Sequence, residues 1–135
     1  MKEIILSLAC LTAVSTGTAA IADETMSTAQ LGALITGNTL YVEIPAGAPG
    51  APDGGTAPIY YATDGSAAAQ LPGGPKLVGT WALEDGRYCI DWDNGPLNSC
   101  THLLRGADGF IVMDATLNEP RGTITRIATG NPEHL

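Results

Sequence analysis

Apolar and polar residues alternate with a period of two through most of the chain after residue 38. This alternation is typical of β-strands that bury one face. It predicts short strands over residues 39–44, 57–63, 67–71, 77–83, 87–92 and 122–128, with a further strand through Cys100 and His102. Residues 109–115 are apolar on both faces and predict a strand that is central in the sheet. Asp-Gly pairs, which tolerate the positive φ of tight hairpin turns, separate strands at Asp64, Asp85 and Asp108. The pattern therefore predicts a series of antiparallel hairpins.

One segment near the N-terminus has the helical period instead. Residues 26–37 place apolar side chains on one face, at Leu31, Leu34 and Ile35. Ser27 and Gln30 have the spacing of a capping box, in which each side chain binds a free backbone N–H of the first turn. The predicted fold class is mainly β (α+β). One N-terminal helix packs across one face or end of a curled antiparallel sheet or small open barrel.

The spacing of two cysteines predicts one disulfide. If Asn94-Gly95 formed a two-residue hairpin tip, Cys89 and Cys100 would lie directly opposite each other, at a spacing that a disulfide can bridge. Pro96 has no backbone N–H to donate across such a tight hairpin. We therefore expect a longer loop over Asp93–Ser99, with the disulfide Cys89–Cys100 at its base.

The first 22 residues have the pattern of a secretory signal peptide. Lys2 precedes an apolar run from Ile4 to Val14, and the segment 20–22 fits the small-x-small cleavage rule. The run is short for a membrane span, so no span is expected after cleavage. Residues 23–135 are then a single β-rich domain, periplasmic or secreted, where a disulfide persists. The formal net charge of −8 argues against nucleic acid and anionic membrane surfaces as partners.

The sequence offers few residues for catalysis or metal binding. A zinc site needs three or four ligands, and His102, His134 and a bridged cysteine pair do not supply them. Asp91, Asp93 and Asn94 crowd oxygen atoms into one turn, where a solvated hairpin tip is expected and calcium is the alternative. The sequence contains no nucleophile elbow, phosphate-binding loop or dinucleotide fingerprint. We therefore predict no catalytic residue, no metal and no cofactor.

The loop Asp91–Ser99 is the predicted contact surface. Trp92 offers a large apolar surface and one hydrogen-bond donor beside acidic neighbours, so the candidate binding residues are Asp91, Trp92, Asp93 and Asn94. The predicted function is a non-enzymatic exported binding or interaction domain for an unknown protein or small ligand. One alternative is a small hydrolase that uses carboxylates near Asp91, Asp93 and Asp114. The other is an inhibitor of a secreted or cell-wall hydrolase that presents this loop.

Short motifs appear in a fixed order along the domain: LITGNT at 34–39, YYATDG at 60–65, GTW at 79–81, RYC at 87–89, Cys100, and GNP at 130–132. This order resembles the DUF995-like family, small secreted alphaproteobacterial proteins of unknown function. The resemblance implies export and a disulfide-tied, β-rich fold. It implies no activity and no catalytic residues.

Overall fold

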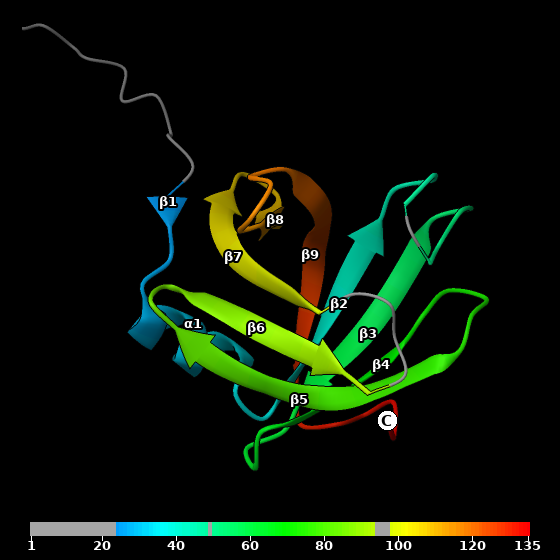
Figure 1. Ribbon diagram of the computed structural model, residues 1–135, viewed down its shortest axis with the longest axis horizontal. Helices are drawn as coiled ribbons and strands as arrows, with labels where there is room; N and C mark the ends of the chain where they lie inside the picture. The colour runs from blue at the N-terminus through cyan, green and yellow to red at the C-terminus, as the bar shows by residue number, and fades with distance from the viewer. Residues whose placement is uncertain (1–23, 49, 94–97) are drawn as a thin grey trace, which may run out of the picture.

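The computed structural model describes residues 24–48, 50–93 and 98–135 (Figure 1). Within them the chain forms one helix and nine strands. In chain order these are β1 Glu24–Thr25, α1 Thr28–Ile35, β2 Asn38–Ile44, β3 Gly55–Tyr61, β4 Ser66–Gln70, β5 Lys76–Glu84, β6 Arg87–Trp92, β7 Ser99–Gly106, β8 Gly109–Asp114 and β9 Pro120–Thr129. Each predicted strand is present, and the predicted bounds lie within two residues of the observed ones.

The strands close into a barrel. Each strand from β2 to β9 pairs antiparallel with the next one in the chain, and β9 pairs back onto β2. The result is an up-and-down barrel of eight strands. The short strand β1 extends the wall beside β7, where Thr25 pairs with Leu104. The sequence predicted a curled sheet or small open barrel, and the structure confirms the antiparallel strands and adds that the sheet closes.

The two ends of the barrel differ in their connections. The three Asp-Gly turns join β3 to β4, β5 to β6 and β7 to β8, so in this up-and-down order they share one end of the barrel. The turn between β5 and β6 lies beside α1, where the Gly86 backbone N–H donates to Thr28 Oγ1 over 2.6 Å (Figure 1). At Asp85 and Gly86 the φ values are 46° and 78°, the left-handed conformation that tight hairpin turns require. Strands β2, β4, β6 and β8 end at the opposite end of the barrel, and each is followed by a longer connection. One end is therefore closed by tight turns and a helix, and the other is surrounded by loops.

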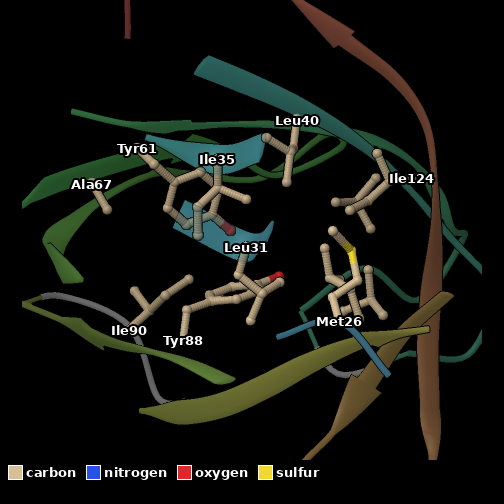
Figure 2. Packing of buried hydrophobic residues seen from close by; sticks show 12 residues of the cluster. Met26, Leu31, Ile35, Leu40, Tyr61, Ala67, Tyr88, Ile90 and Ile124 are labelled. Atoms are coloured by element: carbon tan, nitrogen blue, oxygen red, sulfur yellow. The ribbon is translucent and has the colours of Figure 1, made fainter. Parts of the chain in front are cut away.

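Helix α1 closes the first end because its apolar face enters the barrel. The predicted capping box is present: the Gln30 backbone N–H donates to Ser27 Oγ over 3.2 Å, and the Ser27 N–H donates to Gln30 Oε1 over 2.9 Å. Leu31 and Ile35 are completely buried. Figure 2 shows both side chains lying between Leu40 and Tyr61 on one side and Tyr88 on the other. In the described part of the chain, no helix has the length and apolar character needed to cross a membrane.

Aromatic rings fill the middle of the barrel. The Tyr61 ring packs edge-to-face against Tyr88 at a centroid distance of 5.5 Å and against Trp81 at 5.6 Å. The Trp81 indole N–H donates to the Ala62 carbonyl oxygen over 2.9 Å, which satisfies its only polar group. These contacts join β3, β5 and β6 above the helix.

The disulfide lies where the sequence predicted it. Cys89 and Cys100 are directly opposed partners on β6 and β7, with their Cα atoms 4.0 Å apart. These strands are joined by only three residue pairs before the chain leaves the sheet at the loop end. The covalent bond therefore reinforces a short seam of the barrel wall.

Candidate functional site

The open end of the barrel contains a cavity of about 460 Å³. It lies on the side of the Tyr61, Tyr88 and Trp81 rings (the aromatic layer) that faces away from α1. Residues of the loops that follow β2 and β8 bound it. Because side chains alternate across a strand, every second residue of the surrounding strands faces this space. The strand residues that line it are Val42, Ile44, Ile59, Tyr61, Tyr88, Ile90, Trp92, Ser99, Thr101, Val112, Asp114, Pro120 and Arg121.

The inner part of the cavity is apolar and uncharged. Tyr61 and Tyr88 form its floor, and isoleucine and valine side chains form much of its wall. Burial raises the pKa of Tyr88 to about 12, and burial raises the pKa of Tyr61 further above its ordinary value. Both phenols are therefore neutral at physiological pH. A ligand that reaches this depth meets mostly aromatic and aliphatic surface, with Thr101 directly opposite Tyr88 on the neighbouring strand.

The mouth of the cavity holds an ion pair between the buried Asp114 and the partly exposed Arg121. Asp114 ends β8, and the backbone N–H groups of Thr116 and Leu117 both donate to its Oδ1 atom over 2.8 Å. The Arg121 guanidinium pairs with its Oδ2 atom. The hydrogen bond from Leu117, followed by those from Thr116 and Arg121, lowers the pKa of Asp114 although desolvation acts the other way. Asp114 is therefore an ionised carboxylate that fixes both the loop 115–119 and Arg121.

This arrangement predicts a pH effect on stability. In the unfolded chain the Asp114 carboxyl group has its ordinary pKa of 3.8, and in the folded state its pKa is lower. The ionised group therefore stabilises the fold at pH values above 3.8. This contribution is lost as the pH falls through the lowered pKa of the folded state. Asp114→Asn is therefore expected to be less stable than wild type near neutral pH, with the difference shrinking in acid. Thermal unfolding as a function of pH measures this. Asp91→Asn, at an exposed position, is the control, and a constant difference at all pH values would contradict the assignment.

The predicted binding residues do not form one patch. Trp92 faces the cavity and is half-buried, whereas its neighbours Asp91 and Asp93 are exposed. The Asp93 backbone N–H donates to the Val78 carbonyl oxygen over 2.8 Å, so the strand pairing continues to that point. Asn94 lies outside the described residues. Alternation along β6 thus directs adjacent side chains to opposite sides of the barrel wall.

The carboxylates proposed for a hydrolase have different surroundings. Asp114 is buried and accepts three hydrogen bonds, while Asp91 is exposed on β6, and both residues line a second cavity of about 640 Å³. Among the described residues, the single cluster with metal-ligand spacing is Glu84 with Cys89 and Cys100. Both sulfur atoms there are joined in the disulfide and so are not thiolate ligands. His102 is half-buried on β7 and belongs to no such cluster in this part of the chain.

Sequence reasoning missed the cavity and the role of Arg121. The connections between strands could have indicated the open end, because three Asp-Gly turns alternate with longer loops along the chain. In an up-and-down barrel, alternate connections lie at opposite ends, so this pattern places all tight turns at one end and all long loops at the other. The long loops then indicate where the barrel is open.

The short motifs on which the predicted resemblance to DUF995-like proteins rests lie mainly at the closed end. The Gly37 N–H donates to the Tyr61 carbonyl oxygen, and the Gly130 N–H donates to the Gly37 carbonyl oxygen, over 2.7 and 2.9 Å. The Trp81 N–H donates to the Gly65 carbonyl oxygen over 2.9 Å. These hydrogen bonds connect neighbouring segments at the barrel end that α1 closes. The family resemblance stays a prediction. Comparison with protein-family models, curated proteins and solved structures finds no match to this chain.

Proposed function

We propose that this protein is a non-enzymatic, exported binding protein that holds a small apolar molecule in the open end of its barrel. The observation that carries this proposal is the cavity of about 460 Å³ with an uncharged aromatic floor. Ligand sites in proteins typically have volumes of roughly 300–1,000 Å³, mostly apolar walls and a few polar groups. This cavity has that size and composition.

Among the described residues, large apolar side chains are rarely exposed on the exterior. In the described part of the chain, only Val78 and Leu117 are large apolar side chains that are well exposed, and Leu117 lies at the cavity mouth. An extended contact with a protein partner normally uses a contiguous apolar centre. The binding surface is therefore proposed inside the barrel, with Trp92 as the one sequence-predicted residue that takes part.

The hydrolase alternative requires a carboxyl group that can exchange a proton near neutral pH. Asp114 has a lowered pKa and accepts two backbone N–H groups and the Arg121 guanidinium. These bonds favour a permanently charged, fixed carboxylate. They support a structural and positioning role for Asp114.

Filling the cavity is expected to abolish binding of an apolar probe. The change is Ile59→Trp, because Ile59 faces the cavity from β3 and a larger ring there occupies the ligand's volume. The probe is N-phenylnaphthylamine, which is uncharged and fluoresces when it enters an apolar site. We expect wild type to bind the probe with a saturable increase in emission, and Ile59→Trp to lose most of that signal.

Tyr60→Trp is the matched control, since residue 60 is the adjacent position on β3, is partly exposed and does not line this cavity. Thermal unfolding of both variants shows whether they fold. As a second measurement, Trp81→Phe leaves Trp92 as the only tryptophan, and its emission should shift to shorter wavelength when the probe binds. No saturable binding by wild type, or equal binding by both β3 variants, would be evidence against the cavity as the site.

A further inference from the structure

We infer that the ligand carries a carboxylate on its apolar body and that Arg121 binds this carboxylate at the cavity mouth. The inference rests on the proposed function and specifies the class of ligand. It starts from the position of Arg121, the second residue of β9, which lines the cavity and keeps 36% of its side chain exposed. The Arg121 side chain is therefore accessible to solvent at the edge of the cavity.

Arg121 is held in place before any ligand binds. Its partner Asp114 exposes only 6% of its side chain and is fixed by the backbone N–H groups of Thr116 and Leu117. An arginine side chain that is already oriented loses less conformational freedom when it binds a ligand. The ion pair thus presents a guanidinium of defined orientation at the rim of an apolar space.

The guanidinium has donors left for a ligand. It carries five N–H groups, and Asp114 is its one hydrogen-bond partner among the residues that the structure describes. The planar fork of two N–H groups matches the two oxygen atoms of a carboxylate, and such bidentate bonds are stronger than those between neutral groups. Ser99 and Thr101 on β7 line the same cavity, and each carries a hydroxyl group that can donate a hydrogen bond.

Residues of both charge signs surround the cavity mouth, so direct contacts decide which ligand charge is preferred. Glu119 also lines the cavity, and the chain as a whole has a net charge of −8, both of which oppose an anion. At physiological ionic strength, charges farther than about 8 Å are largely screened. Asp114 already accepts three donors, which weakens it as a partner for a cationic ligand. Direct hydrogen bonds from Arg121 therefore favour a carboxylate, with the apolar body directed toward Tyr61 and Tyr88.

The experiment compares three ligands with one apolar chain and different head groups. Decanoate, decanamide and decylammonium each compete with bound N-phenylnaphthylamine on the full domain. We expect decanoate to displace the probe at the lowest concentration. In Arg121→Gln, decanoate should weaken about tenfold, equivalent to about 1.4 kcal/mol, and should lose its advantage over decanamide.

Arg121→Lys keeps the charge and removes the planar fork, so it should recover only part of the decanoate affinity. If Arg121→Gln fails to fold, the test uses Arg121→Lys and the order of affinity of the three ligands for wild type. Equal binding of the three ligands, or tightest binding of decylammonium, would overturn this inference and leave the proposed function standing. Binding of none of the ligands or the probe would overturn both.

Discussion

Replacing Cys89 and Cys100 together by serine is expected to lower the free energy of unfolding by about 3 kcal/mol. The disulfide closes a short loop, with a sequence separation of 11, and so restricts the unfolded chain. It also spans a seam of the barrel that has only three residue pairs. For a domain of this size, net stability is roughly 5–15 kcal/mol, so the loss is a large share of it.

Urea unfolding followed by tryptophan emission measures the effect as a lower midpoint. Wild type treated with a thiol reductant is the matched control, and it should unfold at nearly the same urea concentration as the double variant. The variant itself should not respond to the reductant. Equal midpoints for the oxidised wild type and the double variant would show that the disulfide contributes nothing to stability.

Replacing Leu31 by alanine is expected to cost about 3 kcal/mol, within the range of roughly 2–5 kcal/mol for buried leucines. Leu31 is completely buried among Leu40, Tyr61 and Tyr88 (Figure 2). Its truncation leaves a cavity between the helix and the aromatic layer, which the surrounding strands are too constrained to fill. Because α1 closes the barrel end, the loss should appear in global unfolding.

Leu117→Ala is the control for this prediction, because it makes the same chemical change at a side chain that is 64% exposed. Its unfolding free energy should stay within about 0.5 kcal/mol of wild type. Both variants are compared by urea unfolding at constant pH. Similar midpoints for Leu31→Ala and Leu117→Ala would contradict the assignment of α1 as part of the core.

The local features of this fold could be predicted from sequence because each depends on neighbouring residues. The capping box needs only Ser27 and Gln30 at the right spacing, and the strands need only alternation. The pairing of Cys89 with Cys100 follows from symmetry about a nearby turn. In each case a few adjacent residues carry the whole pattern.

The site could not be predicted in the same way. Trp92 and Asp91 are adjacent in sequence and were expected to act together, but the barrel wall separates them, with Trp92 facing inward. Only closure of the sheet defines an inside. Arg121 and Asp114 are similarly joined by a loop whose shape is set by hydrogen bonds to the Asp114 carboxylate.

By itself, then, the sequence determined the strands, the capped helix, the tight Asp-Gly turns and the disulfide, because these follow from short-range periodicity and turn chemistry. The tertiary structure decided the closure of the barrel, through the pairing of β2 with β9 across most of the chain. It also decided the cavity and the ion pair at its mouth. These depend on contacts between residues far apart in sequence, whose relative register and facing are fixed only when all the strands pack around one core.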